Sequence, residues 1–375
     1  MTERIYHGLE GVLAGESAIC EVSHTTGGLS YRGYAIEDLA LQASFEEVAF
    51  LLLTGALPSP SAIAEFKETL FQAPRIPEQS LNFLSAFPPS ANRMDLLKVG
   101  IATLGIHDPD CQSNKHAANL RKATRLIAQI PALLEAIQFP KKAGMRLLSE
   151  PAVSHAERVL RQLTGKQPDP FSVKIMNISL ILYAEHELNA STFSARVTAS
   201  TLSDLHSAVT SAIGTLKGPL HGGANEAVME MLIEIDQSGR VQKYVMERLK
   251  RKKRIMGFGH RVLRSGDPRS DIIKGYSQAL GKKKGDERWF KMSVEIEHIM
   301  REEKGLYPNL DFYTASVYWL LGLPISLYTP LFVCSRIAGW TAHIIEQHDN
   351  NRLIRPRCKY TGSKTRVFVP LSERF

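Results

Sequence analysis

The chain has 375 residues, a formal net charge of +8 and four cysteines, with 44% hydrophobic and 22% charged residues. A chain of this length is too long for one simple core, so we expect a large domain and a smaller one. The positive charge predicts an anionic partner, which leaves nucleic acid, a membrane surface and an anionic small molecule open. The cysteines form no CxxC pair, which favours reduced thiols in a cytoplasmic protein.

The ends and apolar stretches of the sequence argue against membrane association. The first residues, MTERIYHGLEG, contain no apolar core of a signal peptide. The longest uncharged apolar stretch covers residues 312–335, but Gly322, Pro324 and Pro330 interrupt it. This pattern predicts two buried helices rather than a membrane-spanning helix.

The expected fold class is all-α with a short N-terminal β-hairpin. Residues 19–22 and 29–32 flank the polar turn SHTTGG, which suits two short paired strands. Elsewhere the apolar residues follow helical spacing, on three faces formed by Ile63, Phe66, Leu70 and Phe71, by Val228, Met231, Leu232 and Ile235, and by Val333, Ile337, Trp340 and Ile344. Neither an alternating βαβ pattern nor a fixed-period repeat is present.

The first chemically informative segment is KGPLHGGANEAVMEML, in which His221 precedes two glycines and a strongly helical pattern. An imidazole at a helix N-terminus faces unpaired amides and the positive end of the dipole, which disfavour its cationic form. A neutral histidine there can donate a hydrogen bond to a developing oxyanion. A plain capping histidine fits the same local pattern.

The segment MGFGHRVLRSGDPRS places His260 after a Gly-Phe-Gly turn, with Arg264 and Arg269 close behind it. The glycines allow a ligand to approach the backbone closely, and guanidinium groups suit carboxylates or phosphates. A basic surface loop is the alternative. The preceding run RLKRKKRIMG, residues 248–257, fits either a solvated helix end or a phosphate contact.

Asp311 lies between the loop YPN and an apolar helix in YPNLDFYTASVYWLL. It fits an N-cap or first-turn aspartate, and it also fits a general base whose pKa is raised by partial burial. Arg336 lies in an apolar helical run, where a buried guanidinium needs an anion unless its end reaches solvent. Arg355 precedes a proline in the next loop, and His186 lies between two glutamates in YAEHELNAST.

The combination of these segments, in this order, resembles the citrate synthase family. The resemblance runs from HGLEGVLAGES to RPRCKYTG, and the motifs GPLHGGANE, GFGHRV followed by DPR, and PNLDFY carry it. It implies an almost entirely helical fold, with residues 1–221 and 318–375 in a large domain and residues 222–317 in a small domain that closes over the substrates. It also implies a homodimer of the short bacterial and archaeal type.

The resemblance implies a role for each motif residue. His221 would stabilise the enol of acetyl-CoA, Asp311 would remove the methyl proton, and His260 would polarise the ketone of oxaloacetate. The pocket for oxaloacetate would contain His186, Arg269, Arg336 and, from the partner subunit, Arg355. The CoA contacts would come from Arg254, Ile255, Met256, Gly257, Phe258 and Arg264. Acetyl-CoA would be a co-substrate, and neither a permanent cofactor nor a metal is expected in the reaction.

One close alternative function and two distant ones differ in the sequence features that they require. A 2-methylcitrate synthase, or an enzyme of dual specificity, shares the machinery but takes propionyl-CoA, and one methylene in a pocket discriminates by only about 1–3 kcal/mol. A nucleic-acid-binding protein would need a recognition motif beside the basic run, and we find none. A metallohydrolase would need ligand spacing such as HExxH, which the sequence lacks.

Overall fold

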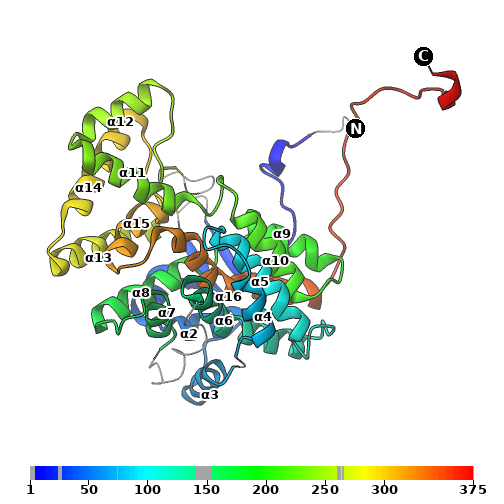
Figure 1. The fold of residues 1–375 in the computed structure, drawn as a ribbon, viewed down its shortest axis with the longest axis horizontal. Helices are drawn as coiled ribbons and strands as arrows, with labels where there is room; N and C mark the ends of the chain where they lie inside the picture. The colour runs from blue at the N-terminus through cyan, green and yellow to red at the C-terminus, as the bar shows by residue number, and fades with distance from the viewer. Residues whose placement is uncertain are drawn as a thin grey trace.

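The computed structural model describes residues 5–23, 28–73, 75–140, 154–259, 263 and 266–374. Within these residues, sixteen α-helices and one three-stranded antiparallel sheet form the fold (Figure 1). The predicted all-α class with a short β element near the N-terminus is therefore confirmed. No helix in the described part of the chain is long and apolar enough to cross a membrane.

The small sheet forms where the sequence predicted a hairpin. Strand β1 (Cys20–Val22) pairs with β2 (Leu29–Tyr31), and an unforeseen third strand, β3 (Tyr34–Ala35), pairs with β2. The ring of Tyr31 is fully buried, and its hydroxyl donates to the carbonyl of Glu185 at 2.9 Å. The sheet therefore anchors the loop that carries the predicted site residue His186.

A larger helical group surrounds the long helix α16, which packs against α2, α6, α8, α9 and α10 (Figure 1). The bounds of this group are α1 (Ile36–Gln42), α2 (Phe45–Thr54), α3 (Pro60–Phe71), α4 (Glu78–Ser85), α5 (Arg93–His107), α6 (His116–Gln138), α7 (His155–Thr164), α8 (Pro170–Tyr183), α9 (Ala190–Ser200), α10 (Leu205–Leu216) and α16 (Tyr328–Asp349). Because α16 is covered on nearly every side, its predicted apolar face is completely buried.

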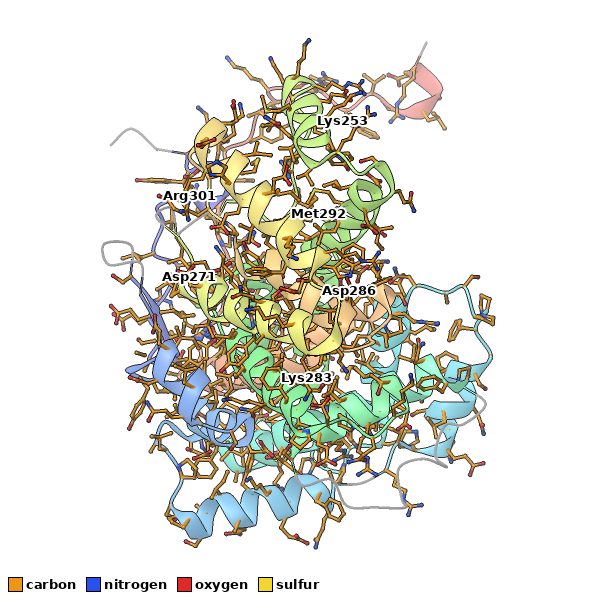
Figure 2. The ribbon with its side chains drawn as sticks, turned by 90° about the vertical axis from the view of Figure 1, so that its left-hand side faces the viewer. Lys253, Asp271, Lys283, Asp286, Met292 and Arg301 are labelled. Atoms are coloured by element: carbon orange, nitrogen blue, oxygen red, sulfur yellow. The ribbon has the colours of Figure 1, made fainter. Side chains whose placement is uncertain are left out.

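A second group of helices lies to one side of the first (Figure 1). Its members are α11 (Ala224–Ser238), α12 (Val241–Lys250), α13 (Pro268–Lys284), α14 (Arg288–Lys304) and α15 (Leu310–Leu320). Figure 2 views this group from outside, with Lys253 near one end and Lys283 near the other. The predicted small domain, residues 222–317, covers most of this group, and its predicted end falls within α15. The division into two domains stays a prediction.

Helix α3 forms as predicted, but its apolar face is only partly buried. Ser59 caps the helix by accepting from the amide of Ala62, and Pro60 occupies the first turn. Of the predicted face only Leu70 is buried, whereas the side chain of Phe71 is 54% exposed. Helix α3 lies at the edge of the larger group, where α2 and α6 pack against it and Arg158 of α7 donates to the carbonyl of Leu70 at 3.2 Å.

The chain after α16 leaves the body of the molecule. Residues 350–374 run outward with no regular element except the short helix η4 (Leu371–Glu373), as Figure 1 shows. Several large apolar side chains on this segment are exposed, among them Val367 and Phe368. We call residues 350–374 the C-terminal arm.

Helix α16 approaches the loop between α8 and α9 closely enough to require a glycine. A Cβ added at Gly339 would lie less than 3.0 Å from both the carbonyl oxygen of Ala184 and the carboxylate of Glu185. The Glu185 carboxylate in turn contacts the ring of His343 at 3.1 Å, and both side chains are completely buried. This contact fixes the loop on the core of the larger helical group.

We predict that Gly339→Ala destabilises the protein by about 1–3 kcal/mol, because the added methyl overpacks a buried contact. The measurement is the midpoint of unfolding in guanidinium chloride. The matched control is Gly214→Ala on α10, where the nearest atom to an added Cβ is 3.9 Å away, so the change should be neutral or slightly stabilising. Equal midpoints for the two variants would contradict the prediction.

Candidate active site

His221 lies in the loop between α10 and α11, just before the N-cap residue Gly223 of α11. The amide of His221 donates to the carbonyl of Gly218 at 2.9 Å, and the next amide, of Gly222, donates to the carbonyl of Leu216. A Cβ at Gly222 would lie 2.5 Å from that carbonyl oxygen, so only glycine fits. The glycine after the histidine is therefore needed to turn the chain into α11.

The hydrogen bonds of His221 define its tautomer. Its Nε2 atom lies 3.3 Å from the backbone amide of Ser191 and 2.8 Å from the Ser191 hydroxyl. Because an amide only donates, Nε2 accepts and the ring proton lies on Nδ1. Burial, with a smaller contribution from the charge of Arg336, lowers the pKa of His221 to about 4. His221 is thus a neutral imidazole that offers Nδ1–H as a donor.

Asp311 lies in the first turn of α15, and its neighbour Asn309 caps the helix. The side-chain oxygen of Asn309 accepts from the amide of Asp311 at 3.1 Å, so the carboxylate of Asp311 is not used as the cap. Its Oδ1 atom instead accepts a hydrogen bond from the hydroxyl of Tyr183 at 2.6 Å. Burial raises the pKa of Asp311 to about 6, opposed by the Tyr183 hydrogen bond and the charge of Arg269.

The predicted glycine turn supports the start of α15. The amide of Asn309 donates to the carbonyl of Gly257 at 2.9 Å, and its side-chain amide donates to the carbonyl of Gly259 at 3.2 Å. Both glycines have φ near +80°. A Cβ at Gly257 would lie 2.8 Å from the side chains of Phe312 and Val228, so the turn needs glycine for conformation and for space.

The predicted CoA contacts differ in their exposure. Ile255 and Gly257 are buried, Met256 and Phe258 are half-buried, and Arg254 is exposed. The ring of Phe258 packs against that of Phe312, with centroids 4.6 Å apart. His260 and Arg264, predicted to polarise the ketone and to contact CoA, lie outside the described residues.

Two of the predicted arginines are buried in the same region. Arg269, 5% exposed, forms a two-pronged ion pair with Asp267, at 2.9 Å from Nε and 2.8 Å from Nη2. Burial alone would lower the pKa of Arg269, but the charge and hydrogen bonds of Asp267 raise it above its usual value. No role in the site was predicted for Asp267 from the sequence, so this pairing is a finding of the structure.

Arg336, 2% exposed, projects from the middle of α16. Its Nε atom donates to the carbonyl of Tyr183 at 2.7 Å, and its guanidinium lies 4.8 Å from the centre of the Phe332 ring. Burial lowers the pKa of Arg336, while the charge of Glu185 opposes that change. The sequence left open whether Arg336 is buried or reaches solvent, and the structure shows that it is buried.

Tyr183 and Phe332 connect the predicted residues, although no sequence motif points to either of them. Their rings are 4.6 Å apart, and the ring of Phe332 lies 6.4 Å from that of His221. Tyr183 thus contacts Asp311 through its hydroxyl, while Phe332 contacts the ring of His221 and the guanidinium of Arg336. In sequence each lies in an apolar helical stretch and resembles an ordinary core residue.

The remaining two predicted residues lie in contrasting surroundings. His186 is buried in the loop between α8 and α9 that Tyr31 and α16 hold. Arg355 is exposed on the C-terminal arm, which leaves the body of the molecule. The structure thus brings His221, Asp311 and Arg336 together around Tyr183 and Phe332 but does not bring Arg355 to them.

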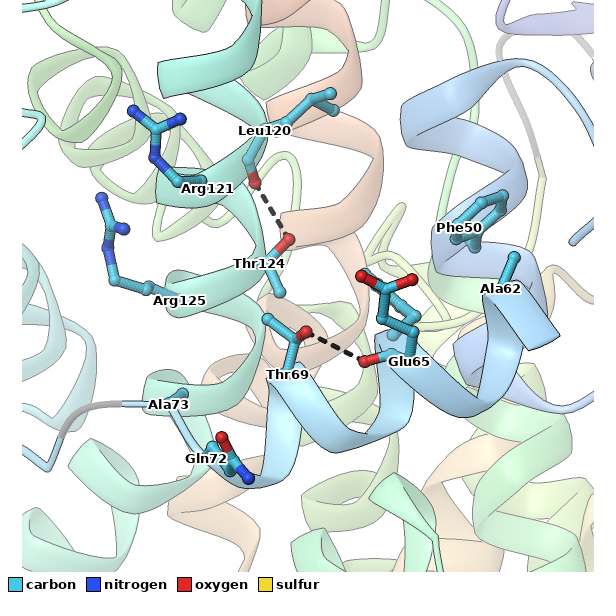
Figure 3. A pocket seen from close by; sticks show the side chains of 11 residues that line it. Phe50, Ala62, Glu65, Thr69, Gln72, Ala73, Leu120, Arg121, Thr124 and Arg125 are labelled. Carbon is cyan, nitrogen blue, oxygen red and sulfur yellow. Dashed lines mark hydrogen bonds between the residues drawn. The ribbon is translucent and has the colours of Figure 1, made fainter.

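A cavity of about 620 Å³ lies elsewhere, between α3 and α6 (Figure 3). Its lining includes Phe50, Glu65, Thr69 and Thr124, and none of the predicted site residues lines it. The hydroxyls of Thr69 and Thr124 bond to backbone carbonyls of their own helices, so they are already satisfied.

Comparisons with known proteins agree with this geometry. The family described as "Citrate synthase, C-terminal domain" matches residues 8–357. The chain belongs to the citrate synthase family. It is 45% identical to citrate synthase 2 of Bacillus subtilis, with 98% of each chain covered, and 44% identical to the 2-methylcitrate synthase of Shewanella oneidensis, with 98% of this chain and 97% of the relative covered.

The solved structures support the same assignment. The chain matches a citrate synthase of Thermoplasma acidophilum in a ternary complex with carboxymethyl coenzyme A and oxaloacetate, with a TM-score of 0.91, 34% identity and all of both chains covered. The predictions of family, fold and acyltransferase class are therefore confirmed. The roles of individual residues stay predictions.

We predict that Tyr183→Phe raises the pKa of Asp311 above about 6, because it removes a hydrogen bond that favours the carboxylate. A base acts only when deprotonated, so activity is lost as the pH falls through this pKa. The acid limb of kcat/KM against pH should therefore move to higher pH. Tyr276→Phe, an aromatic change on α13, is the control and should leave the limb in place. An unshifted limb in Tyr183→Phe would show that the bond does not tune the base.

Proposed function

We propose that this protein condenses acetyl-CoA with oxaloacetate and water to give citrate and CoA. The observation that carries the proposal is that the site contains both a carboxylate suited to accept a proton and a neutral imidazole suited to donate a hydrogen bond. Asp311 has a pKa raised to about 6, which strengthens it as a base, and His221 is neutral with a donor at Nδ1. Both stand on the fold of the citrate synthase family.

The first step is formation of an enol from acetyl-CoA. Asp311 removes a proton from the methyl carbon, and Nδ1–H of His221 donates to the thioester oxygen as charge develops there. General base catalysis contributes about 10²–10⁴ in rate, and one preorganised oxyanion donor about 10²–10³. Tyr183 holds the Asp311 carboxylate and Ser191 fixes the His221 ring, so neither group needs to reorient during the step.

The second substrate, oxaloacetate, is a dianion that suits the buried arginines. Within the described residues, Nε is the only Arg336 nitrogen with a hydrogen-bond partner, which leaves its terminal nitrogens for a carboxylate. Arg269 adds a second positive charge, held in place by Asp267. We assign His186 to the same pocket and give His260 the role of polarising the ketone.

The enol carbon then attacks the polarised ketone carbon, and water hydrolyses the resulting citryl-CoA thioester to release CoA. Closure of residues 222–317 over residues 1–221 and 318–375 would exclude water until the carbon–carbon bond has formed. CoA would bind along Arg254–Phe258 and Arg264, where Arg254 is exposed for its phosphates. The free state of all four cysteines supports a cytoplasmic location.

A second acyl substrate is favoured by the relatives. The chain is almost as similar to the 2-methylcitrate synthase of Shewanella oneidensis as to citrate synthase 2 of Bacillus subtilis, at 44% and 45% identity. The steps above require only a hydrogen on the carbon next to the thioester, so propionyl-CoA can follow the same route. We therefore propose acetyl-CoA as the main substrate, with 2-methylcitrate synthase or dual activity as the alternative.

The C-terminal arm supports a homodimer in which each subunit completes the other's site. Arg355 is exposed, and the arm carries apolar side chains such as Val367, 90% exposed, and Phe368, 79% exposed. An arm of this composition gains stability by lying on another surface. We propose that it crosses to a partner subunit and brings Arg355 to the oxaloacetate pocket there.

The function is tested by thiol release from acetyl-CoA. We expect release that depends on oxaloacetate and that Asp311→Asn lowers by about 10²–10⁴-fold without loss of secondary structure. The control is Asp38→Asn, which changes an exposed first-turn aspartate of α1 and should leave the rate unchanged. Comparing kcat/KM for acetyl-CoA and propionyl-CoA in the same preparation decides the acyl preference. Release with neither substrate would refute the proposed function.

The crossing of Arg355 is tested by complementation. Arg355→Ala should raise the KM for oxaloacetate more than that for acetyl-CoA. Coexpressed Asp311→Asn and Arg355→Ala chains should form mixed dimers in which one of the two sites is intact, giving about a quarter of wild-type activity for random pairing. If both variants stay inactive when mixed, each site is built within one chain and the crossing is wrong.

A further inference from the structure

A second cluster of chemically reactive side chains lies away from the candidate active site. The loop after α5 carries Cys111, Asp204 is the N-cap residue of α10, and His206 lies in the first turn of that helix. The Cys111 sulfur, a carboxylate oxygen of Asp204 and a ring nitrogen of His206 all lie within 4.8 Å of one another. Residues far apart in sequence thus bring a thiol, a carboxylate and an imidazole to one point.

His206 is the unusual member of this cluster. Its side chain is 2% exposed, and within the described residues neither of its ring nitrogens has a hydrogen-bond partner. The nearest carboxylate, of Asp108, is 3.7 Å from Nε2, which is beyond hydrogen-bond distance. Buried polar groups normally have hydrogen-bond partners. An imidazole without one, beside a thiol and a carboxylate that can also bind metal, therefore indicates that these three side chains bind an ion.

We propose that Cys111, Asp204 and His206 bind one Zn²⁺ ion. A thiolate, an imidazole and a carboxylate are the three ligand types that zinc accepts, at about 2.0–2.3 Å. Three protein ligands leave a fourth tetrahedral position for water. The thiolate favours zinc over Mg²⁺ or Ca²⁺, which bind oxygen atoms almost exclusively.

The cluster lies among buried and charged groups. On balance, burial and the charge of Asp204 raise the pKa of Cys111, and the ammonium of Lys122 opposes this change only in part. Lys122 is itself buried and donates to the carbonyl of Ser113 at 2.6 Å, which holds its charge beside the cluster. Asp108 is bound to Arg125 and so is not a fourth ligand, but it offsets the cationic neighbours. The ion would displace the thiol proton and replace it with a bond to Sγ.

The position of the cluster indicates a structural ion. It lies at the start of α10, and the twelve residues of that helix separate it by about 18 Å from the loop of His221. The ion therefore takes no part in the proposed condensation. It would join the loop after α5 to α10, whose far end leads to His221. Cys111 is only half-buried, which gives the ion a path to the site.

The test uses the full-length protein, freed of metal with a chelator and titrated with Zn²⁺. We expect one tight site per chain, seen by competition with a zinc indicator, and a rise in melting temperature on adding zinc. With Co²⁺ as probe, a thiolate-to-cobalt absorption band should appear. Cys111→Ser should remove that band and weaken zinc binding at least about tenfold.

The control variant is Cys358→Ser, which removes an exposed thiol on the C-terminal arm and should leave affinity, band and thermal shift unchanged. Cys111 lies in a loop and is half-buried, so its replacement should not prevent folding; retained secondary structure checks this. The proposal is overturned by the absence of a tight site in the wild type. It is equally overturned by a site that Cys111→Ser leaves intact. Either failure is independent of the condensation, which should persist in EDTA.

Discussion

The hydrogen bond from Tyr183 to Asp311 joins the two groups of helices at the point where the proposed chemistry occurs. Tyr183 ends α8 of the larger group, and Asp311 begins α15 of the smaller one. A partly buried carboxylate is costly unless it accepts hydrogen bonds, and the Tyr183 hydroxyl helps Asp311 to remain ionisable near neutral pH. The position of the base therefore depends on how the two groups pack. A movement of α15 relative to α8 would change both its geometry and its pKa.

The ion pair of Asp267 and Arg269 supports the same junction from the other side. The carboxylate of Asp267 also accepts from the amide of Leu310 at 3.3 Å, and Arg269 reaches the carbonyl of Leu182 at 3.5 Å. The pair thus contacts α15 and α8, one residue before Asp311 and one before Tyr183. A buried ion pair is weak evidence for added stability. Here the ion pair instead fixes the orientation of the Arg269 guanidinium before a substrate binds.

The sequence predicted what depends on local pattern. Helix α16, the β1–β2 pairing and the glycine-dependent turn at Gly257 follow from periodicity and from backbone conformations that only glycine adopts easily. Asn309 displaced Asp311 as the helix cap, which spacing alone could not decide. Tyr183, Phe332 and the Cys111 cluster could not be found in this way, because an aromatic residue in an apolar helix looks like core and because ligands from separate loops have no shared spacing. The partial burial of the apolar face of α3 could not be predicted for a related reason, since periodicity does not reveal how far neighbouring elements cover a face.

The proposed role of Arg355 agrees with the electrostatics of the buried arginines. The positive charges of Arg269 and Arg336 repel one another, and the charge of Arg269 lowers the pKa of Arg336. A third guanidinium fixed in the same pocket would add repulsion whenever no dianion is bound. If the C-terminal arm crosses to a partner as proposed, the third cation would stay hydrated until the partner subunit and a substrate together provide its partners. A site built in this way should bind oxaloacetate strongly only in the assembled protein, which ties substrate recognition to association of the chains.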